Sequence, residues 1–132
     1  MSFLVDTDVG SAFLEQNAVV FNRFNQHAGQ LSVSTVALAE LLTWSFRAGA
    51  PVTRLHGLLS MISDFHVVAI DLAVARRFGM IRAQLLDRGP VVPTADVLIA
   101  ATALEHNLTL VTHNLNHYNK IPSLPIEGWL SP

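Results

Sequence analysis

Short apolar runs recur along the chain and alternate with longer segments of helical periodicity. The runs are bounded by polar residues or glycine and contain mainly leucine and β-branched residues, as buried parallel strands do. Four of them are expected to form strands: Phe3–Val5, Leu31–Val33, His66–Ile70 and Leu108–Thr112. The tail, with Pro122 and Pro125, is expected to be irregular, although Ile126 suits an added edge strand.

The segments between these runs have apolar residues three and four positions apart, which predicts helices. The first segment, from Val9 to about His27, suits one or two helices and ends before Gly29. Ser34 and Asp71 are typical N-cap residues for the helices that follow them. The remaining helices are expected at about Thr35–Phe46, from Pro51 to about Met61, from Leu72 to Gly89, and from Thr94 or Ala95 to His106.

Strands that alternate with helices predict an α/β fold with a parallel sheet. Right-handed crossovers would place helices on both faces of that sheet. In such sheets the functional groups gather at the carboxyl ends of the strands. Asp6 and the segment after Thr112 both lie at predicted strand ends, so we expect them to contribute to a site.

The composition fits a compact domain with apolar surface for a partner. Of the 132 residues, 51% are hydrophobic and 14% are charged, which is too apolar for a disordered chain. Disulfides and thiolate metal sites are excluded because the chain has no cysteine. It also lacks a basic, apolar leader and a run of about 18 apolar residues, so we expect a cytoplasmic, soluble protein without a membrane span.

Three acidic residues lie on otherwise apolar segments. Asp6 follows an apolar strand, Glu40 lies within a mostly apolar helix, and Asp96 begins an alanine-rich helix. Taken singly, each has an ordinary explanation: Asp6 as a turn or cap residue, with Asp8 capping the next helix, Glu40 as a surface residue, and Asp96 as a favourable charge at a helix start. Together they predict one carboxylate pocket, since an unpaired buried carboxylate is costly.

A cluster of carboxylates suits the hard cations Mg²⁺ and Mn²⁺. Such a cation lowers the pKa of a bound water and offsets the negative charge of a phosphodiester, which is the chemistry of a metal-dependent nuclease. The formal net charge of −2 lacks the basic excess of many nucleic-acid binders. Any contact with nucleic acid is therefore expected to be local and supported by cations.

Four segments resemble the sequence blocks of PIN domains, in the order in which that family has them. Each segment is a weak signal by itself, but together they span nearly the whole chain. They are Leu4-Val5-Asp6-Thr7-Asp8-Val9, Ser32 to Leu41 with its Glu40-Leu41 pair, Ala95-Asp96-Val97-Leu98-Ile99-Ala100-Ala101-Thr102-Ala103, and Leu108-Thr109-Leu110-Val111-Thr112-His113-Asn114. The terminal Ile126-Glu127-Gly128-Trp129 is also similar to the end of that family.

The resemblance implies a single PIN-like domain over residues 1–132, built as a three-layer α/β/α sandwich around a parallel sheet of four or five short strands. It also implies a Mg²⁺- or Mn²⁺-dependent endoribonuclease of the VapC-like toxin type. Such a toxin forms a homodimer, cleaves RNA and is neutralised by a cognate antitoxin protein. Asp6, Glu40 and Asp96 match the family's three main acidic positions, as catalytic and metal-binding residues.

His117 departs from the family pattern, because it stands where a fourth acid is often found. With that acid missing, Asn114 is the strongest candidate for an added ligand, and Thr7 and Thr112 are candidates for hydrogen bonds to the carboxylates or to metal-bound water. His117 itself has two interpretations: a group that bonds water or the leaving oxygen, or a solvent-exposed residue.

Two arginines, Arg82 and Arg88, are candidates for contacts with an RNA phosphate, with ordinary surface arginines as the alternative. The His117 departure also keeps a second function open, a catalytically weakened PIN-like module that binds RNA or protein. Metal-dependent cleavage of DNA is a third function that the sequence leaves open.

Overall fold

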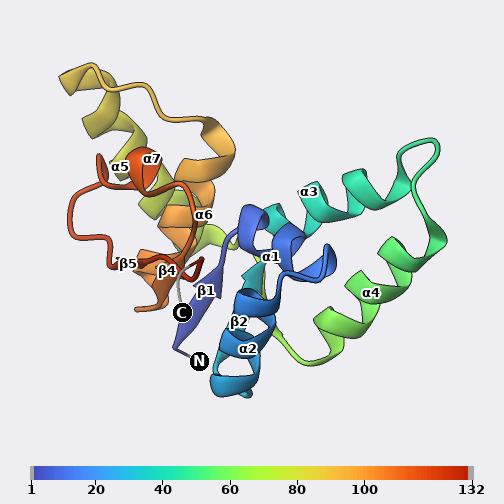
Figure 1. The fold of residues 1–132 in the computed structure, drawn as a ribbon. Helices are drawn as coiled ribbons and strands as arrows, with labels where there is room; N and C mark the ends of the chain where they lie inside the picture. The colour runs from blue at the N-terminus through green and yellow to red at the C-terminus, as the bar shows by residue number, and fades with distance from the viewer. Residues whose placement is uncertain (1, 131–132) are drawn as a thin grey trace.

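The computed structural model describes residues 2–130 and contains an α/β fold in which strands and helices alternate (Figure 1). The strands are β1 (Phe3–Val5), β2 (Leu31–Ser34), β3 (His66–Val68), β4 (Thr109–Val111) and β5 (Ile126–Glu127). The helices are α1 (Thr7–Leu14), α2 (Ala18–Gln26), α3 (Thr35–Phe46), α4 (Val52–Ser63), α5 (Leu72–Arg88), α6 (Thr94–Glu105) and α7 (Leu115–Tyr118).

The five strands form one sheet with the order β3-β2-β1-β4-β5, and every neighbouring pair is parallel. β1 is central, with Leu4 aligned to Ser32 of β2 on one side and to Leu110 of β4 on the other. The predicted parallel sheet of four or five short strands is therefore confirmed. Because the strands run in the same direction, the carboxyl ends of β1, β2 and β4 meet at one edge.

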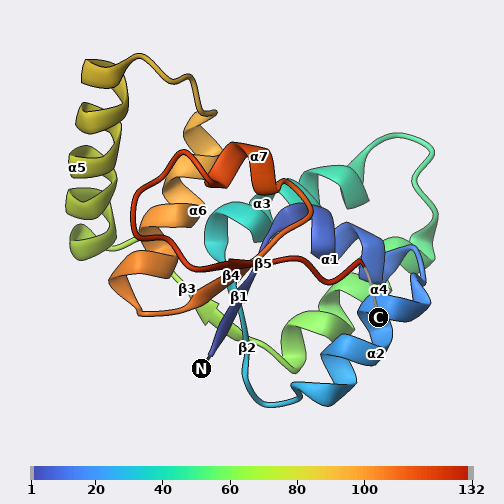
Figure 2. The ribbon, with the colours of Figure 1, turned by 60° about the vertical axis from the view of Figure 1, so that its left-hand side comes forward.

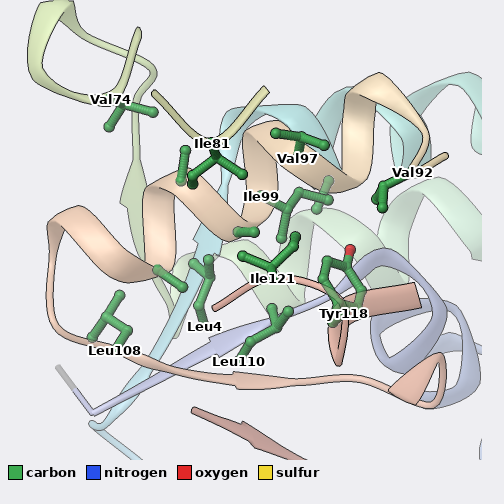
Figure 3. Close-up of a cluster of buried hydrophobic side chains, with 14 of the residues drawn as sticks. Leu4, Val74, Ile81, Val92, Val97, Ile99, Leu108, Leu110, Tyr118 and Ile121 are labelled. Atoms are coloured by element: carbon green, nitrogen blue, oxygen red, sulfur yellow. The ribbon is translucent and has the colours of Figure 1, made fainter. Parts of the chain in front are cut away.

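Helices cover both faces of the sheet, which confirms the predicted three-layer sandwich (Figure 2). Alternate residues of one strand enter different cores, because successive side chains of a strand point to opposite faces. Leu4 and Leu110 pack with α5 and α6, whereas Val5 and Val111 pack with α1, α2 and α4. Figure 3 shows the first of these cores, with Tyr118 of α7 beside Ile121 at one end.

Side-chain caps and left-handed residues set the helix boundaries where the sequence predicted them. The Ser34 hydroxyl accepts a hydrogen bond from the Ala37 amide at 3.1 Å, and the Asp71 carboxylate accepts one from the Val74 amide at 3.0 Å. Gly89 ends α5 with φ of 98°, a conformation that glycine adopts without a Cβ clash.

Several bounds differ from the sequence-based expectations: α1 begins at Thr7 instead of Val9, and β4 is Thr109–Val111 instead of Leu108–Thr112. β3 ends at Val68 instead of Ile70, because its partner strand β2 ends at Ser34 and the chain there turns into α3. The tail is not entirely irregular, since residues 115–118 form the short helix α7. This helix has no strong cap or periodicity in the sequence, and its Tyr118 is held by the core.

Within residues 2–130, no helix is both long enough and apolar enough to cross a membrane. The cytoplasmic location remains a prediction.

Candidate active site

The carboxyl ends of β1 and β4 bring Asp6 and Thr112 together. The Asp6 amide donates a hydrogen bond to the Val111 carbonyl oxygen at 2.9 Å, which continues the pairing of the two strands by one residue. Both residues are buried, with Asp6 5% exposed and Thr112 0% exposed. The sheet therefore fixes a carboxylate and a hydroxyl side by side at its edge.

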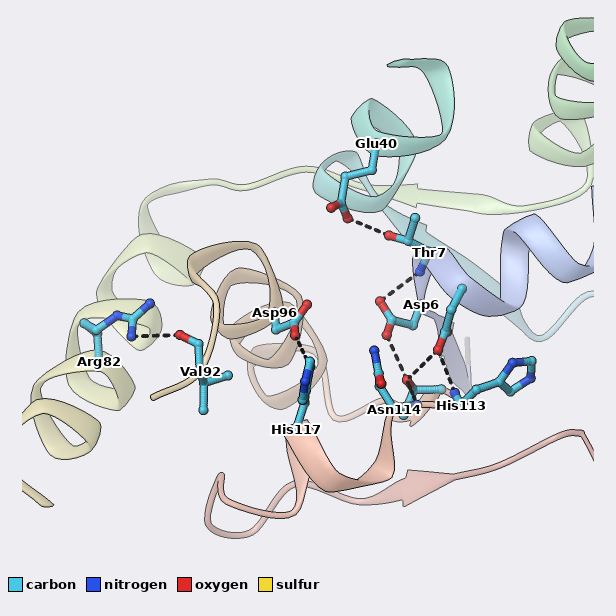
Figure 4. Close-up of polar contacts among 11 residues, drawn as sticks. Asp6, Thr7, Glu40, Arg82, Val92, Asp96, His113, Asn114 and His117 are labelled. Carbon is cyan, nitrogen blue, oxygen red and sulfur yellow. Dashed lines mark hydrogen bonds and ion pairs between the residues drawn. The ribbon is translucent and has the colours of Figure 1, made fainter. Parts of the chain in front are cut away.

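Both carboxylate oxygens of Asp6 accept hydrogen bonds. Oδ1 accepts a hydrogen bond from the Thr7 amide at 2.8 Å, which makes Asp6 the N-cap of α1. Oδ2 accepts a hydrogen bond from the Thr112 hydroxyl at 2.8 Å. These bonds, shown in Figure 4, hold the carboxylate in one orientation.

Burial raises the pKa of Asp6 from its ordinary value of 3.8 to about 7, and the nearby charges of Asp8 and Asp96 add to this rise. The hydrogen bonds from Thr112 and the Thr7 amide act in the opposite direction, because they stabilise the charged form. The net result is a carboxylate whose charge is costly unless a positive charge lies close to it.

Asp96 lies in the first turn of α6 and is paired with His117 of α7. The Asp96 Oδ2 atom is 2.9 Å from the His117 Nδ1 atom, and the two side chains are 19% and 42% exposed. His117 therefore contacts a predicted metal ligand directly instead of facing only solvent. The same pair fixes α7 against the start of α6.

Glu40 is connected to Asp6 through Thr7. The Thr7 hydroxyl donates a hydrogen bond to Glu40 Oε1 at 2.6 Å, and Thr7 directly follows Asp6 in the chain. Glu40 itself is exposed on α3. Figure 4 shows Asp6, Glu40 and Asp96 coming from three separate elements; we call these three residues the carboxylate site.

The carboxylates do not form a ready-made cage for a metal ion. Among residues 2–130, no three histidine, cysteine or acidic side chains lie close enough to hold one ion together. The predicted convergence is therefore partial: Asp6 and Asp96 interact, whereas Glu40 reaches the site only through Thr7. Like charges repel, which opposes a closer approach of three carboxylates.

The donor set nevertheless fits Mg²⁺ or Mn²⁺. Mg²⁺ is commonly bound by one or two carboxylates together with waters and substrate phosphates, without a full protein cage. Asp6 and Asp96 supply such a pair, and because burial raises the pKa of Asp6, a nearby cation would stabilise its charged form. The oxygen ligands of these carboxylates do not suit a soft metal.

Asp8 is a site residue that the sequence analysis did not include. It lies in the first turn of α1, which Asp6 caps, so the interpretation of Asp8 as the cap is wrong. Asp8 Oδ2 accepts a hydrogen bond from the His113 amide at 3.0 Å and lies 3.5 Å from the Thr112 hydroxyl. In the sequence, this role could have been inferred from the second acid, Asp8, two positions after Asp6.

Asn114 is exposed just before α7, where its backbone amide donates a hydrogen bond to the Thr112 hydroxyl at 3.0 Å. Its side chain points toward the same region as Asp6 in Figure 4.

Of the two arginines predicted to contact RNA, Arg88 is exposed at the last position of α5. Arg82 donates to the Val92 carbonyl oxygen at 3.1 Å and to the Thr94 hydroxyl at 3.2 Å, so it braces the segment that leads into α6.

The sequence matches the PIN-domain model over residues 3–121. Ribonuclease VapC2 of Haemophilus influenzae is 27% identical over 131 residues, which cover 98% of this chain and 99% of that protein. The tRNA(fMet)-specific endonuclease VapC of Shigella flexneri is 30% identical over 130 residues, with 98% of each chain covered.

Solved structures of VapBC complexes share the fold. The chain superimposes on the DNA-bound VapBC complex of Salmonella typhimurium with a TM-score of 0.93, 30% identity and 98% coverage of each chain. The DNA-bound VapBC2 complex of Rickettsia felis gives a TM-score of 0.89 at 24% identity, with 98% of this chain and 99% of that chain covered.

Proposed function

Because the chain belongs to the PIN-domain family, as a VapC-like member, we propose that it is a metal-dependent endoribonuclease and the toxin of a toxin–antitoxin pair. The observation that carries the metal dependence is Asp6, a buried carboxylate with a raised pKa that faces Asp96 at the edge of the sheet. The names of the relatives, ribonuclease and endonuclease, support RNA as the substrate.

In this proposal Asp6 and Asp96 would hold a divalent cation, and Glu40, bonded to the Thr7 hydroxyl, would lie at the edge of that site. A bound Mg²⁺ or Mn²⁺ activates water and neutralises charge on the scissile phosphate. Thr112 holds Asp6 in orientation through its hydroxyl. His117, whose Nδ1 atom lies 2.9 Å from Asp96 Oδ2, would hold that carboxylate in orientation.

The first prediction is that RNA cleavage by the purified protein requires Mg²⁺ or Mn²⁺ and stops in EDTA. We expect cleavage of structured RNA, and the relatives named for tRNA(fMet) make that tRNA the first substrate to test. The measurement is gel analysis of labelled tRNA, unstructured RNA and DNA of the same sequence. Cleavage that persists in EDTA would contradict metal dependence, and cleavage of DNA alone would favour the alternative substrate.

An antitoxin partner fits an apolar groove on the side of the molecule formed by α1 to α4. The groove has a volume of about 660 Å³, and Phe13, Phe21 and Trp44 contribute to its lining. A smaller pocket of about 250 Å³ at Thr7 and Glu40 is also lined by Trp44. We propose this groove as the antitoxin site, and the homodimer also remains a proposal.

The His117 position bears on the number of metal ions and on the weakened-module alternative. Two cations bring about four positive charges into a site of this kind, so the three carboxylates of Asp6, Glu40 and Asp96 leave an imbalance. The fourth nearby acid, Asp8, is engaged by the His113 amide. A histidine adds no negative charge, and if protonated it adds repulsion. We therefore propose that one ion binds firmly and that a second binds only with RNA, whose phosphate supplies the missing charge.

The second prediction is that His117→Asp creates a second Mg²⁺-binding event without RNA. The new carboxylate would lie next to Asp96, whose Oδ2 atom is now 2.9 Å from the His117 ring. Isothermal calorimetry of wild type and variant makes the comparison. His117→Asn is the matched control, because it removes the imidazole without adding charge and should bind a single ion. Two comparable events in the wild type would refute the charge argument.

A further inference from the structure

Helix α6 begins without a side-chain cap, although it carries Asp96 in its first turn. The residue at the cap position is Pro93, whose side chain cannot accept a hydrogen bond from the helix amides. The segment before the helix, residues 90–93, belongs to no helix or strand. A helix end of this kind frays unless other groups hold it. The position of Asp96 therefore depends on what fixes the start of α6.

Arg82 of α5 holds this segment on both sides of Pro93. Its Nη1 atom donates a hydrogen bond to the Val92 carbonyl oxygen at 3.1 Å, and its Nη2 atom donates one to the Thr94 hydroxyl at 3.2 Å. Figure 4 shows the guanidinium directed at Val92, on the Asp96 side of the carboxylate site. Because the guanidinium is planar and rigid, the two bonds fix the direction of the segment as well as its distance from α5.

Arg82 is itself held in place by the core. Its neighbours on α5 include Ile81 and Leu85, whose side chains are 6% and 2% exposed, so the helix is firmly packed at this point. The guanidinium carbon lies 5.8 Å from the centroid of the Phe78 ring, within the range of a cation–π contact. The start of α6 is thus tied to a rigid part of the molecule.

The bonds of Arg82 bear directly on Asp96. Thr94 is the first residue of α6 and Asp96 is the third, so helical geometry places Asp96 about 3 Å further along the helix axis. Asp96 therefore has two supports: Arg82 at the start of its helix, and His117, whose Nδ1 atom is 2.9 Å from its carboxylate. Because both acceptors of Arg82 are neutral groups, its contribution there is one of geometry and not of charge pairing.

We propose that Arg82 is a positioning residue of the carboxylate site, which fixes the start of α6 and so holds Asp96 where a divalent cation binds. This inference rests on the proposed metal-dependent function. It gives Arg82 a different role from the contact with an RNA phosphate that the sequence suggested. A ligand that is fixed before binding loses less freedom when the cation arrives, so the two bonds of Arg82 add to cation affinity.

The test is Arg82→Lys, which keeps the positive charge but replaces the rigid fork with a single ammonium group. We expect Mg²⁺ to bind about tenfold more weakly, as for the loss of a residue that orients a metal ligand. Calorimetry measures this affinity at a temperature where circular dichroism shows both proteins fully folded, so a loss of stability cannot mimic the effect. At saturating Mg²⁺, KM for tRNA should be unchanged. Wild-type Mg²⁺ affinity in the variant would overturn the inference, and a raised KM with it would favour the phosphate contact.

Thr94→Val tests the same contact from its other end, because it removes the hydroxyl acceptor and keeps a side chain of similar shape. We expect weaker Mg²⁺ binding, with a smaller loss than for Arg82→Lys, since the bond to Val92 remains. In the double variant the Thr94 substitution should add little, because the contact is already broken. Fully additive losses would show that the two residues act separately, which would overturn the inference.

Arg77→Lys is the matched control. Arg77 lies on the same helix and links α5 to the far end of α6, where its Nε atom is 3.1 Å from Glu105. The substitution should leave Mg²⁺ affinity unchanged, whereas an equal tenfold loss would mean that any break between α5 and α6 weakens binding and would overturn the inference. Absence of Mg²⁺ binding to the wild type would refute both the inference and the metal-dependent function, but a loss of effect in Arg82→Lys alone would refute only the inference.

Discussion

Asp6→Asn is expected to reduce RNA cleavage by about a hundredfold to a thousandfold, the loss typical of removing one charge-stabilising group from an active site. The asparagine oxygen can still accept the hydrogen bond from the Thr7 amide that caps α1, so the fold should persist. The side chain loses its negative charge, and with it the ability to bind a cation strongly. Glu40→Gln and Asp96→Asn are expected to abolish cleavage as well.

The measurement is the rate of tRNA cleavage in excess Mg²⁺, with circular dichroism to verify folding. Asp87→Asn is the control, because Asp87 is an exposed acid on α5 and the substitution removes the same charge. Its rate should equal that of the wild type. A folded Asp6→Asn protein with an unchanged rate would remove Asp6 from the mechanism.

The second large effect concerns stability, which we expect to fall with rising pH because of Asp6. Its pKa is raised from 3.8 to about 7 on folding, so the folded state binds a proton that the unfolded state has released. This contribution to stability is fully present below about pH 4 and is lost as the pH rises to about 7. Above that pH, the ionised carboxylate costs on the order of 4 kcal/mol.

Asp6→Asn should therefore be more stable than the wild type in EDTA, with an advantage that grows by about 3 kcal/mol between pH 5 and pH 8. Urea denaturation of both proteins at the two pH values measures this difference. Added Mg²⁺ should stabilise the wild type at pH 8 and should have little effect on the variant. An advantage that is the same at both pH values would show that Asp6 does not titrate as described.

Much of the fold was predictable because its signals are local. The Ser34 and Asp71 caps and the left-handed Gly89 fix helix ends within a few residues, and the apolar runs mark the strands. The short helix α7 lacked such signals, because it is held by the burial of Tyr118 and not by its own periodicity. Strand ends depended on the neighbouring strand, as β3 shows.

The site was predictable as a set of residue types but not as a set of contacts. Asp6, Glu40 and Asp96 stand out as acids on apolar segments, and the family blocks point to the same residues. The pairing of Asp96 with His117 and the bond from His113 to Asp8 depend on how distant segments pack. No periodicity or spacing in the sequence contains that information.

The bond between Thr112 and Asp6 joins residues that are 106 positions apart in the sequence. Synthesis proceeds from the N-terminus, so β1 exists long before β4 and α7, which lie beyond residue 108. Until those residues are made, β1 lacks a neighbour on one side and Asp6 lacks its partner. The order of translation therefore withholds a complete active site from the growing chain until β4 and α7 have been made.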